Sequence, residues 1–207
     1  MNEKWENAQK WENDWHGNCI NSLGEELKQI VYAEKLGLDF NVTPKTPYNI
    51  NLQGKSILDI GSGPYSLLLK CSDGGKLVAV DPLMDKFGEW VNDRYWNCGV
   101  EPMAKTGESL ENWACNILFD EVWIYNVLEH VENPQKIVEN AKRLGKIVRI
   151  FEWVDSGLNI GHIHILKEKK LNEWLGGTGK VENINKNGAN GTAYYGIFKG
   201  NYYEKSL

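Results

Sequence analysis

Short apolar runs alternate with helical segments between residues 56 and 153, and this alternation restricts the possible folds more than any other feature. The apolar runs predict strands at 56–60, 76–80, 100–104, 120–127 and 145–153. The segments between them predict helices at 64–71, 83–97 and 133–144. Strands that alternate with helices form a parallel sheet with helices on both faces, and the crossovers are right-handed. We therefore predict an α/β fold with a Rossmann-like, doubly wound sheet.

A helix at 168–175 and two further extended segments, at 180–184 and 192–200, are expected after this pattern. The run Gly-Ala-Asn-Gly at 188–191 separates the two segments and favours a hairpin. We expect the sheet to be mostly parallel and seven-stranded, with an antiparallel C-terminal hairpin.

The N-terminal region lacks the alternation and is expected to form helices at 3–16 and 22–36. Ser22 and Glu25 have the spacing of a capping box, which predicts the start of the second helix. The stretch at 41–54 contains two prolines and no helical period, so it is interpreted as a connector.

The length of 207 residues is normal for one α/β domain, which buries a sizeable core without disulfides or a structural metal. We predict one folding unit with a core at 51–207 and a helical extension at 1–50. The formal net charge of −5 disfavours duplex nucleic acid as a partner.

The four cysteines, Cys19, Cys71, Cys98 and Cys115, are widely spaced and form no Cys-x-x-Cys pair. This spacing is typical of neither a disulfide framework nor a zinc site, so a cytoplasmic location is expected. No apolar run is long enough to span a membrane, and the polar N-terminus resembles no targeting peptide. We expect no membrane partner, and the oligomeric state stays open.

A glycine-containing turn follows the first predicted strand and reads Asp59-Ile60-Gly61-Ser62-Gly63-Pro64. Glycines allow a sharp turn and close approach of a ligand, and a following helix would present free N–H groups. Asp81 comes directly after the next predicted strand, where an acid accepts hydrogen bonds from ribose hydroxyls or caps a helix. These features alone predict a nucleoside-bearing cofactor, and NAD is one member of that class.

At this point the chain resembles the class I S-adenosylmethionine-dependent methyltransferases of the small-molecule type. SILDIGSG is similar to their first motif, VAVDP to their ribose-binding motif, and Gly107-Glu108-Ser109 to their adenine-binding turn. The run FDEVWIYNVLEHVENPQKIVENAKRLGKIVRI resembles the family's segment around the fourth strand. The resemblance covers roughly residues 50–200 and departs from the family at Tyr65, where a third glycine is frequent.

The resemblance implies S-adenosylmethionine as cofactor, bound by Asp59, Gly61, Ser62, Gly63, Asp81, Pro82, Leu83, Glu108, Ser109, Asn126 and Val127. It also implies that the region 1–50 forms a lid that builds the acceptor pocket. Asn126 and His130 are the candidate catalytic residues, and a role for His130 in fixing its loop is the alternative. The candidate acceptor pocket consists of Trp11, Trp15, Tyr65, His162 and His164.

We expect no metal ion, because His162 and His164 share no helical spacing with further ligands and no cysteine joins them. A small-molecule methyl acceptor is favoured by elimination. The segment Asn126-Val127-Leu128-Glu129 lacks the tetrapeptide typical of DNA amino methyltransferases, and no cysteine stands beside a proline as cytosine-C5 methylation requires.

Three alternatives stay open at this stage. The same cofactor could be cleaved or donate its aminocarboxypropyl group, and product analysis distinguishes these reactions from methyl transfer. A non-catalytic nucleoside-binding or interaction module would bind without turnover. An NAD-dependent oxidoreductase is disfavoured because Ser66 stands at the third glycine of its fingerprint.

Overall fold

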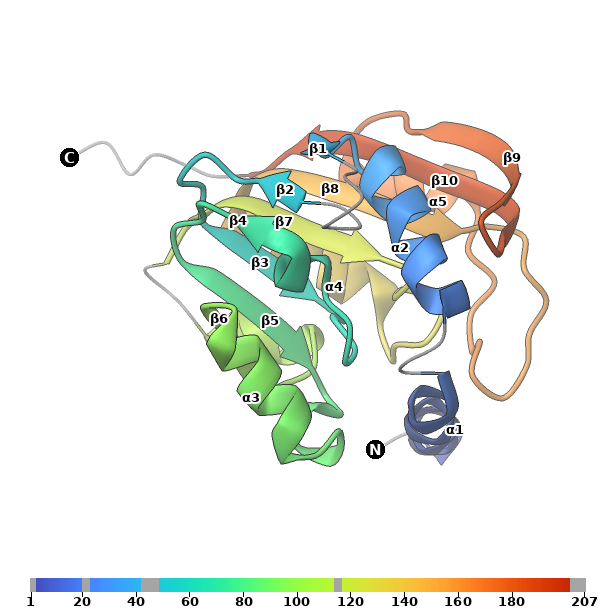
Figure 1. Cartoon of the computed structure of the whole chain (residues 1–207). Coiled ribbons are helices and arrows are strands. Elements are labelled where there is room, and N and C mark those ends of the chain that lie inside the picture. The colour runs from blue at the N-terminus through green and yellow to red at the C-terminus, as the bar shows by residue number, and fades with distance from the viewer. Residues whose placement is uncertain (1–2, 20–22, 42–48, 114–116, 202–207) are drawn as a thin grey trace.

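The computed structural model describes residues 3–19, 23–41, 49–113 and 117–201 (Figure 1). A seven-stranded sheet has the order β6-β5-β3-β7-β8-β10-β9. The strands are β3 (Ile57–Ile60), β5 (Leu77–Asp81), β6 (Val100–Ala104), β7 (Phe119–Tyr125), β8 (Gly145–Trp153), β9 (Lys180–Lys186) and β10 (Ala189–Lys199). The first five are parallel, and β10 pairs antiparallel with both β8 and β9. The predicted sheet, including its antiparallel hairpin, is confirmed.

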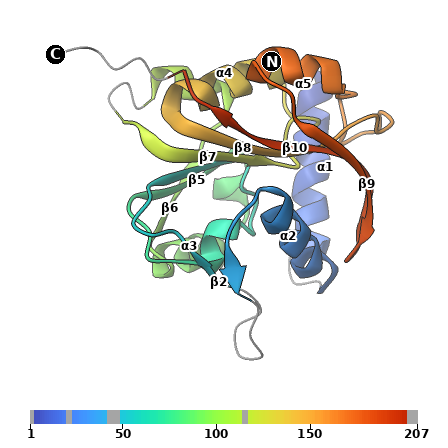
Figure 2. The same cartoon turned by 90° about the horizontal axis from the view of Figure 1, so that it is seen from above.

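Helices cover both faces of the sheet (Figure 2). The helices α2 (Leu23–Lys35) and α3 (Glu89–Asn97) lie on one face, and α4 (Pro134–Leu144) and α5 (Glu168–Leu175) lie on the other. The first helix, α1 (Glu3–Cys19), crosses the end of the sheet instead of packing on a face. None of the helices in the described ranges is both long and apolar enough to cross a membrane.

Strand β7 shows why both faces are apolar. Its side chains alternate in direction, as in any strand. Trp123 and Tyr125 join the core under α2, whereas Val122 and Ile124 join the core under α4. A central parallel strand is buried on both faces, which accounts for its nearly continuous apolar sequence.

The ends of α4 and α5 follow local sequence signals. Asn133 caps α4, because its side chain accepts a hydrogen bond from the N–H of Lys136, and Pro134 occupies the first turn. Gly176 ends α5 in the left-handed conformation. The helices expected at 133–144 and 168–175 are therefore confirmed.

The helix expected at 64–71 is wrong. The chain forms only a short 3₁₀ turn, η1 (Leu67–Lys70), followed by the strand β4 (Cys71–Ser72). Ser66 caps this turn through its side chain. The physical reason is the length of the segment, because only seven residues separate Gly63 from β4.

Two other expectations change in detail. The expected connector at 41–54 contains β2 (Asn49–Asn51), which pairs with β1 (Phe40–Asn41) and with β4 in a second, small sheet. The helix expected at 83–97 is divided at Gly88, so η2 (Met84–Lys86) precedes α3.

The turn of the C-terminal hairpin lies at Asn187 and Gly188, both with positive φ, and not over the whole of 188–191. This Asn-Gly pair suits a two-residue turn, so the following residues belong to β10. Ser22, the expected cap of α2, lies outside the described residues.

Candidate active site

A cavity of about 790 Å³ lies at the carboxyl ends of β3, β5 and β7, beneath α1. This volume is within the range of roughly 300–1,000 Å³ found for ligand pockets. Its walls come from the glycine turn after β3, the loops after β5, β6, β7 and β8, the hairpin turn before β10, and α1. Ligands of open α/β sheets bind at this edge.

Asp59 lies in β3, two residues before Gly61, and is fully buried. Its Oδ2 accepts hydrogen bonds from Ser66 Oγ at 2.5 Å and Tyr125 Oη at 2.7 Å. Burial raises the pKa of Asp59 to about 7, although these two hydrogen bonds oppose the shift. Its Oδ1 is buried and has no hydrogen-bond partner among the described residues. Asp59 therefore links Ser66, the cap of η1, to Tyr125 of β7, and one of its oxygens has no donor among the described residues.

Gly61 is a position where only glycine fits. Its φ is +73°, and an added Cβ would lie 2.5 Å from both methyl groups of Val127. We expect Gly61→Ala to lower the free energy of unfolding by about 1–3 kcal/mol and to weaken ligand binding, because the turn must move. Chemical denaturation checks this result. Gly17→Ala on α1 is the control, since a Cβ added at Gly17 would meet no atom within 4 Å, and equal losses in both variants would contradict the argument.

Asp81 follows β5 and joins two parts of the site. Its Oδ2 accepts a hydrogen bond from the Gly63 N–H at 3.0 Å, and its Oδ1 accepts one from the Leu83 N–H at 2.8 Å. Burial raises its pKa, opposed by the Leu83 N–H and by His16 of α1. Each oxygen keeps a second lone pair, so the carboxylate can also accept hydrogen bonds from a ligand in the cavity.

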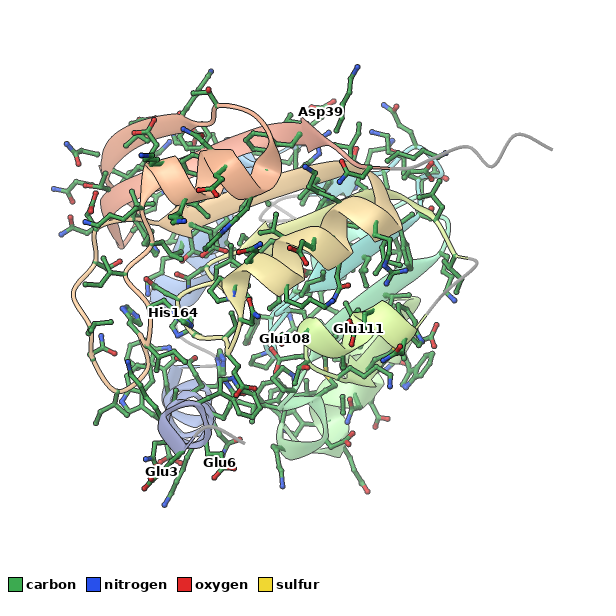
Figure 3. The ribbon with its side chains drawn as sticks, turned by 180° about the vertical axis from the view of Figure 1, so that it is seen from behind. Glu3, Glu6, Asp39, Glu108, Glu111 and His164 are labelled. Atoms are coloured by element: carbon green, nitrogen blue, oxygen red, sulfur yellow. The ribbon has the colours of Figure 1, made fainter. Side chains whose placement is uncertain are left out.

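Glu108 also lines the cavity and lies beside Asn133 at the N-terminal end of α4 (Figure 3). Its Oε1 accepts a hydrogen bond from the Asn133 N–H at 2.9 Å. The Asn140 side chain donates to the carbonyls of Gly107 and Glu108 and so fixes this turn to α4. Ser109 is exposed and donates to a carbonyl within its own turn.

The loop after β7 is held by a buried carboxyl. Glu152 accepts hydrogen bonds from the N–H groups of Val127 and Leu128 at 3.1–3.2 Å. Burial, with the nearby Glu129, raises the pKa of Glu152 to about 8. Asn126 has a φ of +57°, a conformation that asparagine tolerates better than most residues, and it faces the cavity.

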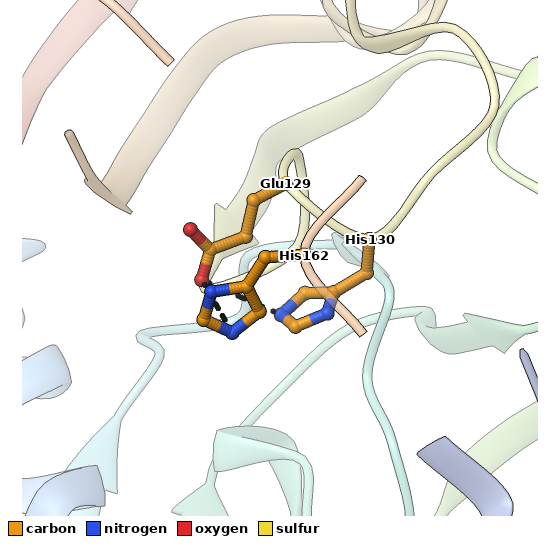
Figure 4. A group of neighbouring side chains, drawn as sticks. All are labelled: Glu129, His130 and His162. Carbon is orange, nitrogen blue, oxygen red and sulfur yellow. Dashed lines mark ion pairs between the residues drawn. The ribbon is translucent and has the colours of Figure 1, made fainter. Parts of the chain in front are cut away.

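The next two residues of this loop, Glu129 and His130, meet His162 from the loop after β8 (Figure 4). His130 Nδ1 lies 2.9 Å from Glu12 Oε1 of α1 and 3.1 Å from the Gly161 carbonyl oxygen. Burial works to lower the pKa of His130, but the Glu12 carboxylate outweighs it and raises the pKa to about 9. This corner of the cavity therefore favours positive charge.

One face of α1 closes the cavity. Trp5, Gln9, Glu12 and His16 line it, with the spacing i, i+4, i+7 and i+11 of a single helical face. The sequence analysis placed Trp11 and Trp15 of this helix in the acceptor pocket, but it did not predict that Glu12 and His16 line the cavity. The i, i+4, i+7 spacing of polar residues is the signal that could have found them.

The structure brings most predicted site residues to this one cavity. Those that line it are Gly61, Ser62, Gly63, Tyr65, Asp81, Pro82, Leu83, Glu108, Asn126, Val127, His130, His162, Trp11 and Trp15. Asp59 and Ser109 do not line it, and neither does His164, whose Nε2 lies 2.8 Å from the Val131 carbonyl oxygen beside a second, smaller hollow.

Solved structures with a similar architecture are S-adenosylmethionine-dependent methyltransferases. A possible histamine N-methyltransferase from Thermotoga maritima superposes with a TM-score of 0.59 at 12% identity, over 97% of this chain and 100% of that chain. The 1,6-didemethyltoxoflavin-N1-methyltransferase of Burkholderia thailandensis, with bound S-adenosylhomocysteine, gives 0.57 at 15% identity, over 97% and 91%. The chain has the class I methyltransferase fold.

Sequence comparison agrees with this methyltransferase fold. The mitochondrial ubiquinone biosynthesis O-methyltransferase of Dictyostelium discoideum is 25% identical over 127 residues, which are 56% of this chain and 37% of that protein. The match therefore spans little more than a third of that relative. No protein-family model matches the sequence.

One observation bears on whether the cavity fits the cofactor of class I methyltransferases. The Asp81 carboxylate lines the cavity next to the glycine turn, and a carboxylate there can accept hydrogen bonds from ribose hydroxyls.

Proposed function

We propose that the protein transfers the methyl group of S-adenosylmethionine to a small-molecule acceptor. The observation that carries this proposal is the Asp81 carboxylate, which accepts a hydrogen bond from the glycine turn and lines a cavity of about 790 Å³. Gly61, Ser62, Gly63, Pro82, Leu83, Glu108 and Val127 would surround the cofactor, with Asp81 on the ribose and Glu108 on the adenine.

The N-terminal region would act as a lid through α1. Methyl transfer is an in-line displacement at a sulfonium carbon, so alignment and exclusion of water supply much of the rate enhancement. Trp11 and Trp15 stack with ring centroids 5.6 Å apart, which gives α1 a rigid aromatic edge at the cavity. Trp11 also contacts the Gly161 backbone beside the acid–histidine corner.

The acceptor would bind between α1 and the loops after β7 and β8, where Asn126, His130, Tyr65 and His162 meet the cavity. Glu12 and the Gly161 carbonyl both lie beside His130 Nδ1, so in this closed arrangement His130 would position a ligand, not accept a proton. A compact cavity covered by a helix supports a small molecule over duplex nucleic acid. The free thiols of Cys71 and Cys98 support a reducing, cytoplasmic compartment.

Calorimetric titration with S-adenosylmethionine, S-adenosylhomocysteine and NAD tests the proposal. We expect micromolar binding of both sulfur-containing ligands and none of NAD, because Ser66 stands where the NAD fingerprint has glycine and its hydroxyl is bonded to Asp59. Binding of NAD alone would overturn the proposal.

Product analysis decides between the reactions open to this cofactor. Incubation with methyl-labelled S-adenosylmethionine and a panel of small hydroxyl and amine compounds should yield labelled product and S-adenosylhomocysteine. Release of methylthioadenosine would indicate aminocarboxypropyl transfer or cleavage instead. Tight binding with no product over the whole panel would favour a non-catalytic module.

A further inference from the structure

Glu129, His130 and His162 form a compact group on the wall of the cavity (Figure 4). One ligand atom from each residue lies within 4.8 Å of the other two. Two imidazoles and one carboxylate are a donor set that divalent transition metals favour, both in zinc enzymes and in iron sites with open positions.

The His130 ring is oriented as a metal-binding histidine would be. Its Nδ1 forms a hydrogen bond with the Gly161 carbonyl oxygen at 3.1 Å and lies 2.9 Å from Glu12 Oε1. Its Nε2 is on the opposite side of the ring and lies 3.6 Å from Glu129 Oε1. Metal-bound histidines almost always donate their second N–H to a carbonyl or carboxylate in this way.

Glu129 supplies the oxygen on which the group converges. Its Oε2 accepts a hydrogen bond from Ser156 Oγ at 3.0 Å, whereas Oε1 is buried and has no hydrogen-bond partner among the described residues. His162 Nε2 lies 3.3 Å from the same Oε1, at an angle that makes no hydrogen bond. An ion-pair network alone leaves this buried oxygen unsatisfied, whereas a cation between the three ligand atoms would satisfy it.

We propose that Glu129, His130 and His162 bind one divalent transition-metal ion, with Glu12 as the carboxylate that positions His130. The group faces the cavity, so the coordination positions not used by protein would be open to a ligand there. This part of the inference rests on the proposed function: the methyl acceptor would be a hydroxyl compound whose oxygen binds the metal.

The metal would lower the pKa of that hydroxyl, as it does for bound water, and the proton would pass to solvent. The oxygen lone pair would then form the O–CH₃ bond as the S–CH₃ bond breaks. The products are a methyl ether and the neutral thioether S-adenosylhomocysteine, so atoms and charges balance.

Titration of Co²⁺ into the metal-free, tag-free protein tests the site without any activity measurement. We expect one equivalent to bind, with visible absorption bands that report nitrogen and oxygen coordination, and Zn²⁺ to displace it. His162→Gln and Glu129→Gln should each weaken binding at least tenfold, and Glu12→Gln about tenfold. His164→Gln is the matched control, because His164 lies two residues away and contacts the Val131 carbonyl instead.

The outcomes separate this proposal from the proposed function. Absence of stoichiometric Co²⁺ binding, or equal affinity in His162→Gln and His164→Gln, would overturn the metal site even if S-adenosylmethionine binds. Co²⁺ binding that depends on Glu129 and His162 supports the site even if S-adenosylmethionine fails to bind. Methylation of amines but not hydroxyls at full rate without metal would overturn the assignment of the acceptor.

Discussion

Replacement of Asp81 by asparagine is expected to weaken the binding of S-adenosylmethionine on the order of 100-fold. In the proposed site the ribose hydroxyls would lose a charged acceptor, and hydrogen bonds to charged groups contribute about 1.5–3 kcal/mol each. The asparagine NH₂ would also face the N–H of Gly63 or Leu83, because both carboxylate oxygens accept hydrogen bonds from the backbone. The variant therefore perturbs the glycine turn as well as the ribose contact.

Calorimetry with S-adenosylhomocysteine measures the loss, and thermal unfolding shows how much of it reflects the turn. Asp85→Asn provides the control, since Asp85 is exposed four residues further along the same segment. If folded Asp81→Asn protein binds S-adenosylhomocysteine as tightly as the parent protein, Asp81 does not bind the ribose. The control variant Asp85→Asn should bind S-adenosylhomocysteine with the affinity of the parent protein.

Replacement of Arg149 by methionine is expected to lower the free energy of unfolding by about 3 kcal/mol, the low end of the cost of breaking a buried ion pair, because Lys55 Nζ remains 3.0 Å from Glu121 Oε1. Arg149 donates from Nε and Nη2 to both oxygens of Glu121, at 2.6 Å and 3.0 Å, and from Nη1 to the Leu36 carbonyl. Glu121 is 2% exposed and also accepts from the Trp123 indole N–H at 2.9 Å. The pair joins β7, β8 and the end of α2.

Chemical denaturation of Arg149→Met measures this effect, with Lys76→Met as the control. Lys76 and Glu101 form an ion pair at 3.7 Å in which both side chains are at least 40% exposed. Exposed pairs contribute about 0–1 kcal/mol, so the control should change little. Similar losses in the two variants would show that burial of the Glu121 pair has no special importance.

The same pair predicts how stability depends on pH. Burial works to raise the pKa of Glu121, but Arg149 and the Trp123 N–H outweigh it and lower the pKa from 4.5 to about 2. A carboxyl with a lowered pKa stabilises the fold above its unfolded value, and this contribution is lost as the pH falls from about 4.5 to 2. The shift corresponds to about 3 kcal/mol. In Arg149→Met, the free energy of unfolding should change less between pH 2.5 and pH 6 than it does in the parent protein.

The sheet could be predicted because its apolar runs are separated by turns, whereas the order of its strands came only from the structure. Boundaries were less predictable where hydrogen bonds from distant residues decide them. The segment after Gly63 contains helix-compatible leucines, but the Tyr95 and Tyr125 hydroxyls bind the N–H groups of Ser66 and Leu67. Those tyrosines come from other elements, so local sequence could not reveal the short turn.

The site was predictable along the core strands and less so where α1 meets them. The motifs placed Asp81, Glu108 and the Glu129-His130 pair, and the structure brings all of them to one cavity. Their roles stay predictions until ligands are tested. Glu12 was missed because its partner, His130, is more than a hundred residues away, and nothing in the sequence of α1 specifies that contact.

Because α1 approaches Asp81 through His16 and the corner at His130 through Glu12, one helix touches both the proposed cofactor site and the proposed acceptor site. Any displacement of α1 by one ligand changes the free energy of binding the other. Thermodynamic linkage makes this effect reciprocal, so the factor by which an acceptor tightens cofactor binding equals the factor by which the cofactor tightens acceptor binding. An acceptor therefore can be sought by its effect on the affinity for S-adenosylhomocysteine, before any product is known.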